Sequence, residues 1–183
     1  MFIMKLAVSL FELLLMAAAS GLVIYITYRV FVRANPDFDM EEEIKRGNTA
    51  VGILMAAILV SASMMLERGL SSVVSLFRLQ LYSQPETAFP VWKSGLLMLG
   101  HMALALAIAV FTISFTLRLF GRVSRWHRPD FRPGAELQRG NVAVGILLAA
   151  VVLVAGLYVA EGVSALTKAL IPQPPVGQIH IMR

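Results

Sequence analysis

Residues 43–62 read EIKRGNTAVGILMAAILVSA, and residues 136–155 read ELQRGNVAVGILLAAVVLVA. Twelve of these twenty positions are identical at a constant offset of 93 residues. An internal repeat determines how the remainder of the chain is read, because each copy is expected to form the same local structure. The sequence therefore predicts a fold assembled from two related units.

The composition of the chain is that of a membrane protein. Its 183 residues are 58% hydrophobic and 15% charged, with a mean hydropathy of +0.76. A soluble domain of this length cannot bury so much apolar surface. Four apolar stretches (6–28, 49–66, 94–117 and 142–160) approach or exceed the roughly 20 residues that an α-helix needs to cross a bilayer. We expect an all-α integral membrane protein with four transmembrane helices.

Each repeat is expected to be a helix hairpin. The offset of 93 maps the second apolar stretch onto the fourth, and an offset of 89 maps the first onto the third. The predicted parts are 1–78 for repeat 1 (spans about 6–31 and 45–77), 79–93 for the connecting loop, 94–171 for repeat 2 (spans about 94–120 and 138–170) and 172–183 for a proline-rich tail outside the membrane. A unit with two crossings ends on the side where it began. The repeats are therefore predicted to be parallel and related by a pseudo-twofold axis along the membrane normal.

The basic residues predict the orientation in the membrane. The loops after the first and third spans hold ten of the sixteen Lys and Arg residues. By the positive-inside rule, both loops lie in the cytoplasm and both termini lie outside it. Insertion thus explains the positive charge, and no nucleic-acid partner is predicted.

The shared motif E-x-x-R-G-N-x-A-V-G-I-L-x-A-A is interpreted as structural. Glutamate and arginine three residues apart meet on a helix, and small residues four apart let membrane helices approach closely. We expect the small residues, continued by Ser63 and Glu67, to lie between the second and fourth spans, and the asparagines to cap helices or bond across them. The predicted packing residues are Gly47, Asn48, Gly52, Ala56, Gly140, Asn141, Gly145 and Ala149.

The start of the second span is also predicted from its residues. Asp39 is a plausible N-cap for a helix that begins at Met40, because its carboxylate can accept a hydrogen bond from the first turn. This helix is expected to run without interruption into the second span.

Ionisable residues within the apolar helices differ between the repeats. Glu12 and His101 occupy equivalent positions, as do Arg68 and Glu161. With Glu67, these residues are predicted to form one polar band near the outer leaflet, in which Glu12 pairs with His101 and Arg68 with Glu161. Ionisable groups inside a membrane indicate a proton or ion path. The alternative is a structural belt that reaches interfacial water by snorkelling.

Catalytic motifs are absent from the sequence. It contains no H-E-x-x-H, P-loop or G-x-S-x-G pattern, and its three histidines lie on three different segments. These motifs are the usual signs of metalloprotease, nucleotide and serine-hydrolase chemistry. The sequence has no cysteine, which excludes disulfides and thiolate metal sites. We expect neither an enzyme, nor a metal site, nor a cofactor.

Two tandem helix pairs, each with R-G-N and then A-V-G-I at the start of its second helix, resemble the YjfL-like small bacterial inner-membrane proteins. That family is built from two copies of a domain of unknown function. The resemblance covers nearly the whole chain apart from the proline-rich tail. It implies a four-span protein of the bacterial inner (cytoplasmic) membrane, and it supplies no activity, substrate or catalytic residue.

The leading functional hypothesis is a homo-oligomeric ion or proton channel, or a transporter-like module, in the lipid bilayer. In this interpretation Glu12 and His101 gate or bind ions. The alternative is a non-transporting scaffold or stress-response subunit that docks a soluble partner on its basic loops. The candidate docking residues are Arg122, Arg125, Trp126, Arg128 and Phe131.

Overall fold

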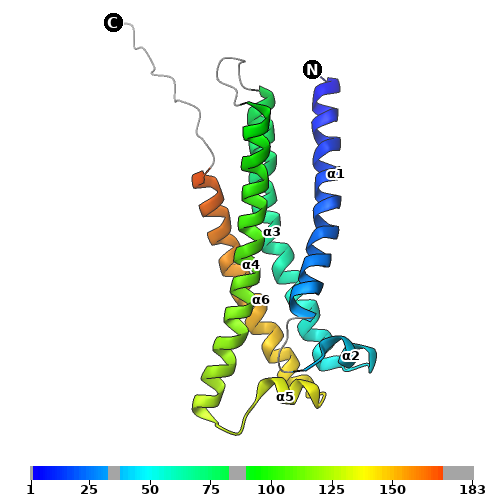
Figure 1. The fold of residues 1–183 in the computed structure, drawn as a ribbon, viewed down its shortest axis with the longest axis vertical. Helices are drawn as coiled ribbons and strands as arrows, with labels where there is room; N and C mark the ends of the chain where they lie inside the picture. The colour runs from blue at the N-terminus through cyan, green and yellow to red at the C-terminus, as the bar shows by residue number, and fades with distance from the viewer. Residues whose placement is uncertain (1, 33–37, 83–89, 171–183) are drawn as a thin grey trace, which may run out of the picture.

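The computed structural model describes residues 2–32, 38–82 and 90–170, and all regular elements in these residues are helical (Figure 1). The four long helices are α1 (Phe2–Thr27), α3 (Thr49–Tyr82), α4 (Val91–His127) and α6 (Val142–Leu170). A π-helical turn, η1 (Tyr28–Val32), extends α1, and the short helices α2 (Met40–Lys45) and α5 (Pro133–Gln138) precede α3 and α6. Each long helix is long and apolar enough to cross a membrane. The predicted all-α, multi-pass membrane protein is confirmed.

The helix α3 lies at the centre of the bundle. It packs against α6, α4 and α1, and α4 also packs against α6. Among the candidate spans α3 is the most buried and α1 the least, and Figure 1 shows α1 standing to one side. The short helices α2 and α5 lie together at one end, which we call the loop end. The predicted tail at 172–183 lies outside the described residues.

The contact between α3 and α6 depends on two glycines of α6. A methyl group added at Gly145 would lie 2.7 Å from the Ala50 carbonyl oxygen and 2.8 Å from the Ala50 Cα. A methyl group at Gly156 would overlap the Ser61 hydroxyl, which donates a hydrogen bond of 3.3 Å to the Val152 carbonyl oxygen. Close approach of this kind is how helices associate in lipid, where packing replaces the expulsion of water.

Only the α6 half of the predicted small-residue interface is present. Ala149 is buried with Gly145, but Gly52, Ala56 and Ser63 are exposed on α3, and nothing lies within 4 Å of a methyl group placed at Gly52. The prediction that the Gly52 stripe meets α6 is therefore wrong. The physical reason is the rotation of α3, since its fully buried Ala50 faces α6 and lies about 200° from Gly52 around the helix.

The expected uninterrupted helix from Met40 into the second span is also not formed. The helix α2 ends at Lys45, and α3 begins at Thr49. Between them Gly47 has a φ of 78°. The backbone N–H of Asn48 donates a hydrogen bond of 2.9 Å to the backbone carbonyl oxygen of Glu43. This is a Schellman turn, which favours glycine because side chains clash at positive φ. Gly140 also has a φ of 78° and ends α5 in the same way. The backbone N–H of Asn141 donates a hydrogen bond of 3.0 Å to the backbone carbonyl oxygen of Glu136.

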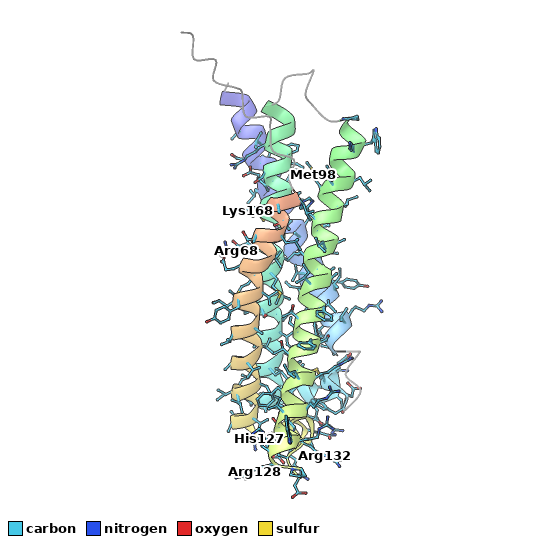
Figure 2. All side chains as sticks on the ribbon, turned by 90° about the vertical axis from the view of Figure 1, so that its left-hand side faces the viewer. Arg68, Met98, His127, Arg128, Arg132 and Lys168 are labelled. Atoms are coloured by element: carbon cyan, nitrogen blue, oxygen red, sulfur yellow. The ribbon has the colours of Figure 1, made fainter. Side chains whose placement is uncertain are left out.

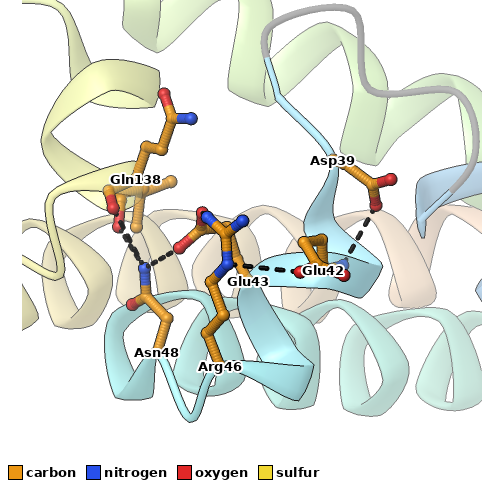
Figure 3. Close-up of polar contacts among 7 residues, drawn as sticks. Asp39, Glu42, Glu43, Arg46, Asn48 and Gln138 are labelled. Carbon is orange, nitrogen blue, oxygen red and sulfur yellow. Dashed lines mark hydrogen bonds and ion pairs between the residues drawn. The ribbon is translucent and has the colours of Figure 1, made fainter.

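The E-x-x-R-G-N residues hold this turn together (Figure 3). The predicted N-cap is confirmed, because the Asp39 carboxylate accepts from the Glu42 amide at 3.1 Å. The side-chain nitrogen of Asn48 donates to the Glu43 carboxylate at 2.8 Å. The side-chain oxygen of Asn48 accepts a hydrogen bond from the backbone N–H of Ala50 at 3.1 Å. Arg46 pairs with the Glu43 carboxylate at 3.4 Å. The asparagine thus caps α3 while the buried glutamate holds the asparagine in place.

The second loop repeats these interactions. Arg139 pairs with Glu136 at 2.9 Å, and the Asn141 amide nitrogen donates to Glu136 at 3.0 Å. Asn48 makes one further hydrogen bond, from its side-chain nitrogen to the Leu137 carbonyl oxygen at 2.8 Å. Among the described residues, Asn141 makes no equivalent bond to α2. The bond from Asn48 to Leu137 ties the start of α3 to α5. The shared motif therefore forms two turns and fastens one of them to the other.

The long helices exceed the predicted spans. The helix α3 continues to Tyr82 and α4 runs from Val91 to His127, whereas the sequence predicted a loop at 79–93. The facing ends of α3 and α4 contain polar residues, so hydropathy alone places these ends outside the membrane spans. The backbone nevertheless stays helical there. A helix of 37 residues is about 55 Å long, which exceeds the roughly 30 Å hydrocarbon core.

Candidate functional site

His101 is the most unusual polar side chain in the bundle. It is 4% exposed and lies on α4 where this helix meets α3, with its carbonyl oxygen 3.7 Å from a methyl group placed at Gly69. Its Nδ1 lies 2.7 Å from the Leu97 carbonyl oxygen. Among the described residues, its Nε2 is the one buried side-chain nitrogen or oxygen that has no hydrogen-bond partner. A buried polar atom without a partner is costly, so it needs an explanation.

The tautomer of His101 follows from its neighbour. A carbonyl oxygen accepts hydrogen bonds but cannot donate them, so Nδ1 carries the hydrogen in the bond to Leu97. The unpartnered Nε2 of the neutral ring is then a bare lone pair inside the bundle. Such a lone pair can accept a proton or the hydrogen of a water molecule.

Three of the predicted band residues lie at about the same level along the bundle as His101. Arg68 pairs with Glu161 at 2.8 Å, which confirms the predicted contact between these two helices. Glu67 precedes Arg68 and is exposed on α3. Gly69, the residue after Arg68, packs against the turn of α4 that holds His101 and Ala105. The structure therefore brings His101, Glu67, Arg68 and Glu161 to one level, with Arg68 seen on the outside of the bundle in Figure 2.

Glu12 does not pair with His101. Its carboxylate instead accepts two hydrogen bonds from Arg78 on α3, at 2.7 and 3.0 Å. The neighbouring rings of Phe11 and Phe77 stack with centroids 4.1 Å apart. Phe77 lies eight residues beyond Gly69, so this contact is about 12 Å along α3 from Gly69. The predicted Glu12–His101 pair is wrong, and Glu12 fastens the otherwise peripheral α1 to α3.

Sequence reasoning missed Arg78. It was assigned to the end of repeat 1, whereas α3 continues past it to Tyr82. The apolar residues just before it, including Phe77, were a signal that the helix extends this far. The identity of its partner could not be read, because the tilt of α1 against α3 decides which residues meet.

An apolar hollow of about 260 Å³ lies between α1, α3 and α4. Its walls include Val23 of α1, Leu66 of α3 and Leu106 of α4, and all the residues that line it are apolar. This hollow offers no polar group to an ion. Within the described residues, no three His, Asp or Glu side chains gather into a group that could hold a metal ion.

A comparison with protein families matches residues 5–163 to the family described as Domain of Unknown Function (DUF350). The chain belongs to the DUF350 family. The match extends over all four candidate spans, from α1 into the second half of α6, so DUF350 describes the membrane bundle as a whole. No curated protein and no solved structure matches the chain.

The candidate docking residues of this DUF350 protein lie at the loop end. Trp126 is 85% exposed, the largest exposure among the large hydrophobic side chains that the structure describes. Arg122, Arg125 and Arg128 are exposed around it, whereas Phe131 is half-buried against the core. Figure 2 shows His127, Arg128 and Arg132 at the lower end of α4. Of the predicted docking residues, Trp126 and the three arginines are therefore exposed to a partner. Phe131 packs against the core and is not a free docking residue.

Proposed function

We propose that this DUF350 protein is an oligomeric membrane module that moves protons across the membrane, with His101 as the group that accepts and releases them. The observation that carries this proposal is the unpartnered Nε2 of the buried His101. An imidazole is the side chain best suited to exchange protons near neutral pH. Ionisable groups inside membrane proteins commonly form proton paths.

Buried hydroxyl groups support a polar route beside His101. Ser72 lies one helical turn beyond Arg68, and Ser164 lies one turn beyond Glu161. Since Arg68 and Glu161 pair, both serines belong to the level of His101. Hydroxyl groups both donate and accept hydrogen bonds, so they can hold the water through which a proton would travel.

Self-association is part of the proposal, because the charged groups at this level face outward. Arg68 is 47% exposed and Glu161 67% exposed in the single chain, a costly arrangement if both faced hydrocarbon. The small-residue stripe of Gly52, Ala56 and Ser63 is open on the same helix as Arg68. A second copy packed on this stripe would cover Glu67, which is exposed on α3 and lies about 60° from Gly52 around the helix.

The proposal also includes the symmetry and orientation expected from the sequence. The two hairpins are taken as parallel repeats about a pseudo-twofold axis along the membrane normal. The loop end is taken as cytoplasmic, with both termini outside, in the inner membrane of a bacterium. Within DUF350, we place the chain with the YjfL-like proteins on its tandem R-G-N motif.

The test is proton flux into vesicles that contain the purified protein. Wild-type protein should collapse an imposed pH gradient faster than empty vesicles do, and His101→Ala should return the rate to the empty-vesicle level. Glu12→Gln is the matched control, because Glu12 is tied to Arg78 and lies away from His101. Wild-type flux no faster than empty vesicles, or undiminished flux in His101→Ala, contradicts the proposal. Parallel assays with K⁺ and Na⁺ gradients distinguish proton movement from movement of other cations.

A scaffold that docks a soluble partner at the loop end remains the second candidate. Its supporting observation is the exposed Trp126, since aromatic residues beside arginines are typical anchors of protein interfaces. Capture of a defined cytosolic protein by wild type but not by Trp126→Ala, with vesicle flux at background, favours this function. If Trp126→Ala captures the same protein equally well, the scaffold proposal fails.

A further inference from the structure

We propose that the outward face of α4 near the loop end binds the phosphate headgroups of acidic phospholipids. We call this surface the arginine face, and it comprises Arg118, Arg122, Arg125 and Trp126. It does not depend on proton movement by His101. Its occupant is the membrane that the chain itself spans.

The arginine face is continuous with an apolar surface of α4. Phe111 and Phe115 are both exposed, and their rings stack with centroids 5.8 Å apart. At 3.6 residues per turn, Phe111, Phe115, Arg122 and Trp126 all lie within about 80° of Arg118 around the helix. One side of α4 therefore changes from exposed aromatic rings to arginines, as a surface does where acyl chains give way to headgroups.

The arginines on this face are available for an anion. All three are exposed, and within residues 2–32, 38–82 and 90–170 no carboxylate lies within ion-pair distance of them. Arg125 makes only a hydrogen bond to the carbonyl oxygen of Gly121, at 3.1 Å. Guanidinium groups bind phosphate with paired hydrogen bonds, so several unpaired arginines on one face suit a phospholipid headgroup.

The loop of the second repeat carries a larger net positive charge than the loop of the first. Residues 29–46 contain four basic and five acidic side chains, a net charge of −1. Residues 118–139 contain six arginines and two carboxylates, a net charge of +4. In the first loop Lys45 pairs with Glu41 at 3.0 Å and Arg46 with Glu42 at 3.3 Å. The second loop therefore has a net positive charge that the acidic headgroups of the membrane can balance.

A lipid fits this face better than a soluble protein does. The arginines begin seven residues after Phe111, about 10 Å along the helix, so a single phospholipid can touch the rings with its chains and the guanidinium groups with its phosphate. Basic clusters directly beside a membrane helix are also the usual sites for acidic headgroups.

The two tryptophans of the chain allow a direct test. Trp126 lies at the arginine face and Trp92 near the other end of the same helix, 71% exposed. The protein is placed in phosphatidylcholine vesicles that carry a minor fraction of brominated phosphatidylglycerol or of brominated phosphatidylcholine, since bromine quenches tryptophan on contact. Trp92→Phe leaves Trp126 as the reporter, and Trp126→Phe leaves Trp92. Trp126 should report enrichment of the acidic lipid by roughly fivefold or more, because each arginine near a membrane surface is worth about that factor. Trp92 should report no such preference.

The decisive variant removes the three arginines as Arg118→Gln/Arg122→Gln/Arg125→Gln in the Trp92→Phe background. The control, Arg29→Gln/Lys45→Gln/Arg46→Gln, removes the same number of charges from the first loop. Enrichment beside Trp126 should disappear in the first and persist in the second. The proposal is overturned if Trp126 shows no preference for acidic lipid, if both variants lose it equally, or if the arginines prove necessary for binding a soluble protein but not for lipid enrichment. All variants are first checked for helical content, which surface substitutions should leave unchanged.

Discussion

Replacing Gly145 by alanine tests the contact between α3 and α6 on which the bundle depends. The added methyl group would lie 2.7 and 2.8 Å from backbone atoms of Ala50, which cannot rotate away as a side chain can. Overpacking of this kind costs about 1–3 kcal/mol, and the gain in helix propensity from Gly to Ala offsets about 1 kcal/mol of it. Gly52→Ala has the same propensity gain but meets nothing within 4 Å.

The propensity term cancels when the two variants are compared. Gly145→Ala should therefore have a free energy of unfolding about 1–3 kcal/mol below that of Gly52→Ala. The measurement is reversible unfolding in mixed micelles, followed by helical circular dichroism as the fraction of denaturing detergent rises. Equal stability of the two variants, or a lower stability of Gly52→Ala, would show that α6 does not pack against Ala50 through Gly145.

Three further predictions concern the loop turns and the ion pair between α3 and α6. Asn48→Ala should lower the free energy of unfolding by about 1 kcal/mol more than Asn141→Ala does, which is the net value of one additional hydrogen bond. The reason is that, of the two asparagines, Asn48 is the one that bonds to Leu137. Equal losses in the micelle assay would contradict the link between α3 and α5. A double-mutant cycle on Arg68→Gln and Glu161→Gln should give a coupling of about 0.2–1 kcal/mol in detergent, as for exposed ion pairs, and zero coupling would mean that the 2.8 Å contact does not stabilise the bundle. The hydrogen bond from Asn141, aided by Arg139, holds the pKa of Glu136 below its ordinary value of 4.5. The ionised carboxylate therefore stabilises the folded state above that value, and this contribution is lost as pH falls through the lowered pKa. Acidification below about pH 4.5 should destabilise wild type more than Glu136→Gln, and parallel pH profiles would contradict this.

The four helices could be predicted because their cause is local. Apolar length alone separates a membrane span from a loop, and the Glu–Arg pairs of the loop turns follow from a spacing of three residues. The N-cap at Asp39 is likewise readable, since the side chain and the amide that it accepts from are three residues apart. Such features need no knowledge of how the helices are tilted or rotated.

Two of the incorrect predictions depend on geometry between elements. Whether the Ala50 or the Gly52 side of α3 meets α6 is set by a rotation of that helix, and both sides carry small residues. The tilt of α1 brings Glu12 to Arg78 instead of His101. The break at Gly47 could be read only in part from the sequence. A glycine followed by asparagine is a turn signal, but glycine is also tolerated inside a membrane helix.

The central claim, that His101 carries protons across the membrane, is tested most directly by proton flux into vesicles that hold equal amounts of wild-type and His101→Ala protein. The account predicts that wild type collapses the pH gradient well above the rate of empty vesicles and that His101→Ala matches them. Equal flux through the two proteins, or wild-type flux at the empty-vesicle rate, would contradict it.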